Sequence, residues 1–298
     1  MAVKLPVHVA FITLLISASC TVKKEQKANV RDVYKAEGYH LTWADEFNRS
    51  GKPDAANWTY EKGFVRNEEL QWYQPENAFC ENGMLIIEAR KEHKPNPLYV
   101  AGSQQWRKKP QFIEYTSACL ISQGLQSFQY GRFEMRGKIN VSSGLWPAWW
   151  TLGETGTWPA NGEIDIMEYY QQKVLANIAS LGKNGKPKWF STTKSITELG
   201  GPAWAEEFHI WRMDWDAEGI SLFIDDVLVN KVAMDKLGNE NGTLPHPFRQ
   251  KHYILFDLAM GGLNGGELAG TRFPNRLEVD YVRVYQKNSV NTDAGTQN

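Results

Sequence analysis

Three carboxylates lie within six residues of one another and are the side chains best placed to do chemistry in this sequence. They are Glu163, Asp165 and Glu168, in the stretch Gly-Glu-Ile-Asp-Ile-Met-Glu-Tyr from Gly162 to Tyr169. The β-branched and large apolar residues between them are typical of a half-buried strand. Two carboxyl groups held about 5–5.5 Å apart can act as nucleophile and acid/base of a retaining glycosidase. The alternative is an acidic strand face that only meets water.

The strand that carries these carboxylates must be irregular if all three are to meet. Side chains on a regular strand alternate between faces, so Glu163 and Asp165 would share a face with Met167, and Glu168 would point away. One extra residue, a β-bulge, returns Glu168 to the common face, and bulges cluster beside active sites. A carboxyl group between the outer two would then hold a proton or a hydrogen bond and separate their pKa values.

Four tryptophans stand just upstream of the carboxylates, three in residues 144–150 and one at position 158. Their flat rings suit the apolar face of a sugar. We expect Trp146, Trp149 and Trp158 to stack on sugar, and Trp150, which alternates with Trp149, to enter the core. A proline follows Trp146 and Trp158, which suits an edge strand or a loop. The alternative for each ring is the hydrophobic core.

Together these features resemble glycoside hydrolase family 16, in its laminarinase-like branch. The family pattern is Glu, apolar, Asp, two apolar residues, Glu, and the three carboxylates match it with the extra bulge residue. Further blocks follow in the family's order, so the resemblance covers nearly all of the chain after residue 40. These blocks are residues 43–47, 130–136, 144–150 and 279–285.

The resemblance implies a β-jelly roll with a concave substrate cleft and endo-acting hydrolysis of β-linked polysaccharide with net retention of configuration. It implies that Glu163 is the nucleophile, that Glu168 is the acid/base, and that Asp165 hydrogen-bonds Glu163. Glu69 and Asn77 fall in a region that lines the non-reducing side of the cleft in similar proteins. No cofactor is expected for catalysis.

One departure from the family pattern bears on the substrate. Laminarinase-like members usually carry a histidine on the strand after the catalytic strand, whereas residues 175–180 are Leu-Ala-Asn-Ile-Ala-Ser. We expect Asn177 to take that place, because an amide can both donate and accept. A β-1,3-glucan or mixed-linkage glucan is implied. A β-galactan such as agarose, porphyran or carrageenan, or a galactose-containing host O-glycan, stays open.

The resemblance also implies a structural calcium ion on the convex face. Glu46, the backbone carbonyl of Gly83 and Asp280 match the positions of its ligands in similar proteins. Oxygen ligands from distant segments suit this hard cation. The alternative is a solvent-facing acidic pair.

The first twenty residues carry a targeting pattern. Lys4 precedes a largely apolar run that is too short to span a membrane, and Ser-Ala-Ser-Cys follows it. This resembles a bacterial lipoprotein signal cut before Cys20, whose thiol takes a lipid; a plain secretory signal is the alternative. We expect a signal at 1–20, a solvated tether at 21–40, the catalytic domain at 41–288 and a tail at 289–298. The protein is then exported and anchored to a bacterial envelope membrane, or else secreted.

Composition excludes several other classes. The 298 residues carry a formal net charge of −1, so there is no basic field for nucleic acid. GxSxG, HExxH, Walker and Cys-x-x-Cys patterns are absent. Short apolar runs separated by turn residues predict an all-β antiparallel sandwich. We expect a monomer. Residues 261–266 should form a loop at the cleft edge, and His209 should have a structural role. We expect buried free thiols at Cys80 and Cys119, and a disulfide between them stays open.

Two other functions share this pattern. A non-catalytic surface lectin is the rival from another class, because a jelly roll binds sugar without cutting it and a fold alone does not decide function. A binding module has no use for two facing glutamates, so the complete set of carboxylates favours an enzyme. A transglycosylase would use the same residues, with a sugar in place of water.

Overall fold

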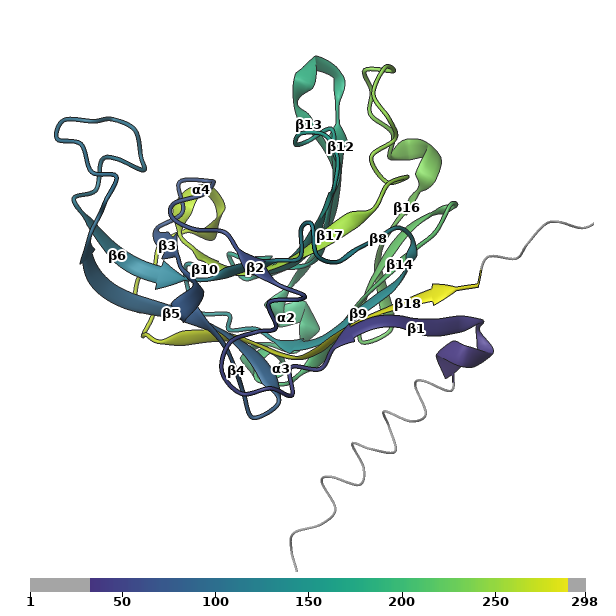
Figure 1. Cartoon of the computed structure of the whole chain (residues 1–298), viewed down its shortest axis with the longest axis horizontal. Coiled ribbons are helices and arrows are strands. Elements are labelled where there is room, and N and C mark those ends of the chain that lie inside the picture. Colours follow the sequence, from purple (N-terminus) through teal and green to yellow (C-terminus); the bar gives the residue numbers. More distant parts are fainter. Residues whose placement is uncertain (1–32, 289–298) are drawn as a thin grey trace, which may run out of the picture. The chain divides into compact units, whose positions relative to one another are not determined.

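Two β-sheets form the compact unit Leu41–Gln286 of this protein, seen here in a computed structural model (Figure 1). The structure describes residues 33–288. The expected signal peptide, Cys20, most of the tether and the tail lie outside the described residues. The prediction of an all-β, jelly-roll sandwich is confirmed.

The first sheet has ten strands among the described residues. Its main path runs β16 (Val227–Ala233), β15 (Gly219–Ile224), β14 (His209–Trp215), β9 (Gly131–Lys138), β18 (Asn275–Lys287), β5 (Met84–Pro95), β6 (Phe112–Ser117) and β3 (Gln71–Tyr73). Off this path, β1 (Tyr39–Asp45) pairs with β18 and β4 (Ala78–Glu81) pairs with β5. The β3–β6 pair is parallel.

The second sheet, with eight strands among the described residues, carries the predicted catalytic strand near its centre. Its main path runs β13 (Pro187–Ser195), β12 (Lys173–Leu181), β11 (Glu163–Tyr170), β10 (Leu145–Gly153), β17 (His252–Met260), β7 (Cys119–Ile121) and β2 (Thr59–Tyr60), with β8 (Ser127–Phe128) beside β17. Every pair in this sheet is antiparallel.

Helices are short in the described residues. Besides the helical residues 33–36, they are η1 (Pro75–Asn77), η2 (Lys183–Gly185), α2 (Ile196–Leu199), α3 (Pro202–Ala205), η3 (Met234–Lys236) and α4 (Gly262–Gly265). None of the described helices has the length and apolarity needed to cross a membrane. The single turn α4 lies within the predicted glycine loop. A β-carbon on Gly262 would come within 2.5 Å of the carbonyl oxygen of Asn67, so this loop packs directly on the segment that borders the site.

The core fills the space between the two sheets. Buried apolar residues of β10, β11 and β17 form one cluster with those of β9 and β14. Trp149 is fully buried and stacks on Phe256, with ring centroids 6.1 Å apart. Ile164 and Met167 of β11 are fully buried in the same cluster. One face of β11 is therefore committed to the core, and its other face is free for the site.

Three smaller predictions have clear outcomes. Cys80 and Cys119 are buried free thiols, as expected. His209 bonds the Asp225 carboxylate and the carbonyl of Trp204, so its structural role is confirmed. The sequence of residues 115–122 also predicts a single strand, and this prediction is wrong, because the strand breaks at position 118 and the chain enters the second sheet as β7.

Candidate active site

The β11 strand contains the predicted bulge. Glu163 faces Ala179 and Asp165 faces Asn177 on β12, but Glu168 faces Leu175, so three steps on β11 match two on β12. The extra residue lies at Ile166–Met167, which are both buried in the core. The bulge returns Glu168 to the face of the other two carboxylates, as a bulge of this kind does. All three line one pocket.

Each outer carboxylate of this pocket is held by an indole. Trp146 on β10 donates its indole N–H to Oε1 of Glu168 at 2.8 Å, and Asn177 donates its amide to Oε2 at 2.7 Å. Trp158, in the loop before β11, donates to Oε2 of Glu163. Trp158 is half exposed, and its ring stands beside the carboxylate that it binds. Trp146 is buried, but it lines the pocket.

The middle carboxyl group is poised to stay protonated. Burial and the charges of Glu163 and Glu168 raise the pKa of Asp165 well above its usual range. Asp165 shares a hydrogen bond with Glu163, which helps to hold the pKa of Glu163 down against the effect of burial. The pKa of Glu168 is raised to about 8, chiefly by burial. Burial raises the pKa of Glu163 as well, but the hydrogen bonds from Trp158 and Asp165 favour its charged form. These bonds to Glu163, and the raised pKa of Glu168, suit the two groups to the roles of nucleophile and acid.

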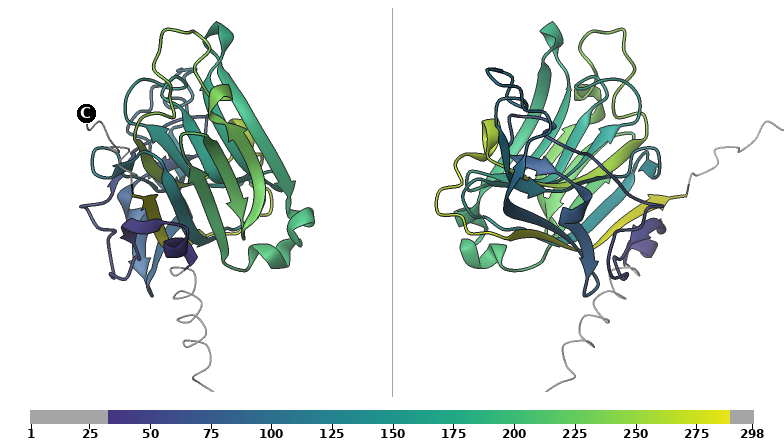
Figure 2. Two further views of the ribbon diagram at one scale, coloured as in Figure 1. Left: turned by 90° about the vertical axis from the view of Figure 1, so that its right-hand side faces the viewer. Right: turned by 60° about the vertical axis from the view of Figure 1, so that its left-hand side comes forward.

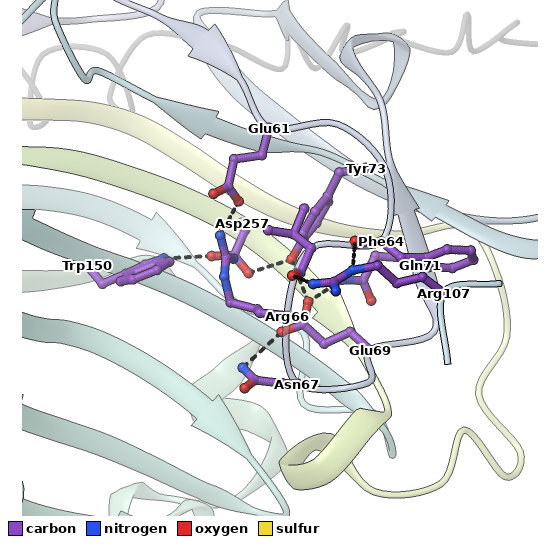
Figure 3. Close-up of polar contacts among 11 residues, drawn as sticks. Glu61, Phe64, Arg66, Asn67, Glu69, Gln71, Tyr73, Arg107, Trp150 and Asp257 are labelled. Carbon is purple, nitrogen blue, oxygen red and sulfur yellow. Dashed lines mark hydrogen bonds and ion pairs between the residues drawn. The ribbon is translucent and has the colours of Figure 1, made fainter. Parts of the chain in front are cut away.

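A further carboxyl group of the pocket, which was not predicted from the sequence, comes from β17, on the other side of β10 from β11. Asp257 on β17 accepts from the indole of Trp150 at 2.7 Å and from the hydroxyl of Tyr73 at 3.0 Å. Figure 3 shows Trp150 and Tyr73 approaching it from opposite sides. Burial raises the pKa of Asp257 to about 6. The available signal was a lone carboxylate inside the apolar run of β17.

Glu69 borders the pocket, and its place on the non-reducing side of the cleft stays a prediction. It is buried and accepts from Gln71 at 2.7 Å and from Asn67 at 3.2 Å. The Tyr73 hydroxyl lies 3.3 Å from the same carboxylate, so it stands between Glu69 and Asp257. Burial raises the pKa of Glu69 to about 7.

The predictions for Trp149 and Trp150 are both wrong, because each residue lies where the other was expected. Trp149 was expected at the sugar and Trp150 in the core, but Trp149 is fully buried in the core and Trp150 lines the pocket. Alternation along β10 gives the reason, because Trp146 and Trp150 are four residues apart and share a face, whereas Trp149 lies on the other. The Arg66 guanidinium lies 5.1 Å from the centre of the Trp150 ring and pairs with Glu61.

The prediction for Asn77 is wrong. Its side chain is fully buried away from the pocket-lining residues. The amide donates to the carbonyl of Glu88 on β5 at 2.7 Å and to the Thr116 hydroxyl on β6 at 3.0 Å. A buried amide must find such partners, so Asn77 joins two strands and does not face substrate.

The residues proposed for calcium do not fit that ion as they are arranged. Arg283 holds Glu46 through two hydrogen bonds, at 2.6 and 2.8 Å. Arg136 donates to Asp280 at 2.9 Å. Both carboxylates therefore already have a cation beside them, and a calcium ion would have to compete with the two arginines for their oxygens. Calcium binding stays a prediction that these contacts do not support.

Paired carboxyl groups that line one pocket of a two-sheet sandwich are the arrangement that a glycoside hydrolase uses. Residues 66–283 match the sequence model of glycosyl hydrolases family 16, and the chain belongs to that family. It is therefore an endo-acting glycoside hydrolase.

Three relatives illustrate the similarity. The β-glucanase of Rhodothermus marinus is 36% identical over 269 residues, which cover 85% of this chain and 87% of that protein. The laminarinase catalytic domain of Thermotoga maritima is 31% identical with a TM-score of 0.69, over 84% of this chain and 99% of that one. A structure from work on endo-acting O-glycanases with which human gut bacteria initiate mucin breakdown is 32% identical with a TM-score of 0.74, over 84% and 92%.

Proposed function

We propose that this enzyme hydrolyses internal linkages of a β-1,3-glucan or mixed-linkage β-glucan with retention of configuration. The observation that carries the chemistry is the bulge in β11, which brings Glu163, Asp165 and Glu168 to one face of one pocket. The similarity to a β-glucanase and to a laminarinase domain supports the substrate.

In the first step, a carboxylate oxygen of Glu163 attacks the anomeric carbon of the sugar beside the cleaved bond. The glycosidic C–O bond breaks, and the departing oxygen takes the proton of Glu168. A covalent glycosyl-enzyme with inverted configuration results. Burial keeps Glu168 protonated to a pH near 8, so the acid is ready in neutral solution.

In the second step, Glu168 has become a carboxylate and accepts a proton from water. The water oxygen attacks the anomeric carbon and releases Glu163. Two inversions restore the β configuration. Asp165 keeps its hydrogen bond to Glu163 and stabilises the carboxylate as it leaves the sugar. A second sugar can take the place of water, which would give transglycosylation.

The test is a screen of the purified protein on β-1,3-glucan, mixed-linkage glucan, agarose, porphyran, carrageenan and mucin. We expect oligosaccharides from the two glucans, with the β anomer formed first in proton NMR. Release from a galactan or from mucin alone would replace the proposed substrate. Binding to glucan without release would support the lectin alternative, and longer products with added acceptor sugars would indicate transglycosylation.

The roles of the two glutamates can be separated with azide. Glu163→Ala lacks the nucleophile, so azide would attack the substrate directly and give the α-glycosyl azide. Glu168→Ala retains the covalent step on an activated substrate, so azide would give the β-glycosyl azide. The opposite stereochemistry would reverse the two assignments.

We also propose that the chain is exported and anchored through a lipid on Cys20, on the sequence pattern alone. Mass spectrometry of the mature N-terminus would detect the lipid. Cys20→Ala should release activity from the membrane fraction. An unmodified, soluble mature protein would favour the secreted alternative, and gel filtration would test the expected monomer.

A further inference from the structure

One exposed aromatic ring outside the pocket lies on the same face of the sheet as the carboxylates. Glu163 of β11 faces Ala179 of β12, and Ala179 faces Trp189 of β13. Directly opposed residues of antiparallel strands share a face, so Trp189 is on the face that carries Glu163. Two strand spacings place it about 10 Å from Glu163 along that row.

The neighbours of Trp189 on β13 point the other way. Phe190 packs against the core. Lys188 lies over the Phe190 ring, with its ammonium 4.9 Å from the ring centre, and pairs with Glu240 at 2.7 Å. The Trp189 side chain therefore has no place in the core, and 44% of the residue is exposed. Exposing a large indole is unfavourable in water, and such a ring marks a binding surface when it continues one already built.

Hydrogen bonds to a neighbouring segment hold the β12–β13 hairpin that carries Trp189. Strands β12 and β13 rise beside the segment that follows η3, as Figures 1 and 2 show from several sides. The backbone N–H of Leu181 donates to Asn239 at 3.0 Å, and that of Lys183 donates to Glu240 at 3.0 Å. An aromatic side chain on a strand that is already held in place loses little conformational entropy when it binds a ligand.

The position of the β12–β13 hairpin identifies the part of the polysaccharide that it would contact. Asn67 and Glu69 line the pocket beside Asp257, on the other side of β11 from this hairpin. The family resemblance implies that Glu69 lies on the non-reducing side of the cleft. On that premise, the β12–β13 side is the side of the leaving group.

We propose that Trp189 is a stacking platform for a β-linked hexose of the leaving group, beyond the sugar next to the cleaved bond. This inference rests on the proposed function and adds a determinant of specificity to it. The apolar face of the sugar covers the exposed indole, so substrates long enough to reach β13 bind better than short ones.

The experiment compares two substrates in wild type and Trp189→Ala. One is a long β-1,3-glucan oligosaccharide. The other is an aryl β-glycoside whose leaving group ends at the first position past the cleaved bond. We expect Trp189→Ala to lower kcat/KM about tenfold on the long chain, mostly through KM, and to leave the aryl substrate within about twofold. Trp189→Phe should retain most of the wild-type value.

Thr192→Ala is the matched control, because it changes a residue of the same strand on the opposite face. It should leave both substrates unchanged. Equal losses on both substrates for Trp189→Ala, or no loss on the long chain, would overturn the stacking role. A wild-type enzyme with no activity on any β-glucan would instead overturn the proposed function, so the two failures are distinguishable.

Discussion

The side-chain amide of Asn177 donates to Oε2 of Glu168 at 2.7 Å, although Asn177 faces Asp165 in the strand register. The bulge makes this diagonal contact possible, because it moves Glu168 back by one position relative to β12. Trp146 holds the other oxygen of the same carboxylate. Glu168 thus accepts hydrogen bonds from both neighbouring strands, and each bond favours its charged form.

Removing the Asn177 contact should change the pH dependence of hydrolysis. The hydrogen bond from Asn177 opposes the effect of burial on the pKa of Glu168, which is raised to about 8. In Asn177→Ala this pKa should rise further, so the alkaline limb of kcat/KM should move to higher pH. The measurement is kcat/KM from pH 5 to about pH 10.

The control for Asn177→Ala is Ser191→Ala, which alters the next residue in the same row of the sheet. Its pH profile should match that of the wild type. Trp146→Phe removes the other hydrogen bond and should shift the alkaline limb in the same direction. An unshifted limb in both Asn177→Ala and Trp146→Phe would show that Glu168 is not the group that must be protonated.

The indole of Trp158 should affect the acid limb of the pH profile of kcat/KM. Its indole hydrogen bond lowers the pKa of Glu163 against the effect of burial. Trp158→Phe keeps a ring but loses the donor, so the pKa of Glu163 should rise and the acid limb of kcat/KM should move to higher pH. The alkaline limb should stay in place. A shift of the alkaline limb alone would contradict the assignment of Glu163 as the ionised nucleophile.

Loss of the nucleophile should abolish turnover without unfolding the protein. Glu163→Gln is nearly isosteric, so we expect kcat to fall by more than about a thousandfold. The melting temperature should stay close to that of wild type, because the amide can still accept from Trp158. Hydrolysis at the wild-type rate by this variant would end the assignment.

Glu69 should make the enzyme less stable as the pH rises. Burial raises its pKa from 4.5 to about 7, so the folded state keeps a proton that the unfolded chain releases. The free energy of unfolding therefore falls between about pH 4.5 and pH 7. Glu69→Gln is neutral throughout and should gain on the order of 1–3 kcal/mol relative to wild type across that window.

The measurement is urea unfolding of Glu69→Gln and wild type at several pH values, with the exposed Glu76→Gln as control. Other buried groups also titrate. The raised pKa values of Asp257 and of the three carboxyl groups of β11 act in the same direction, and His252, whose pKa is lowered to about 4 by burial, acts in the opposite one. All of these groups remain in the variant, so the difference between the proteins isolates Glu69. A difference that does not change with pH would refute the prediction.

The burial of Trp149 and the exposure of Trp158 predict unequal effects of their removal on stability. Trp149 is fully buried, so Trp149→Ala should cost about 3–5 kcal/mol of unfolding free energy. Trp158 is half exposed in a loop, so Trp158→Ala should cost much less while still impairing catalysis. Chemical denaturation of the two variants is the measurement. Equal losses would mean that Trp149 is not a core residue.

The sequence by itself determined the strand that carries the chemistry and the class of fold. Alternation, turn residues and the spacing of Glu163, Asp165 and Glu168 are local properties, and they sufficed to predict a bulged strand in an all-β sandwich. The bulge was predictable because the only other solution turns Glu168 into the core, where its charge would be unpaired. The places of Trp149 and Trp150 were also within reach, since parity along β10 decides them once Trp146 is placed.

Only the tertiary structure decided which distant groups meet. Tyr73 reaches Asp257 across 184 positions of sequence, and the row from Glu163 to Trp189 exists only when three strands pair in one register. Asn77 lies close in sequence to the residues that line the pocket, yet its amide is used by two strands. Strand pairing is set by long-range packing of the core, which no local pattern specifies, and that pairing determines the walls of this site.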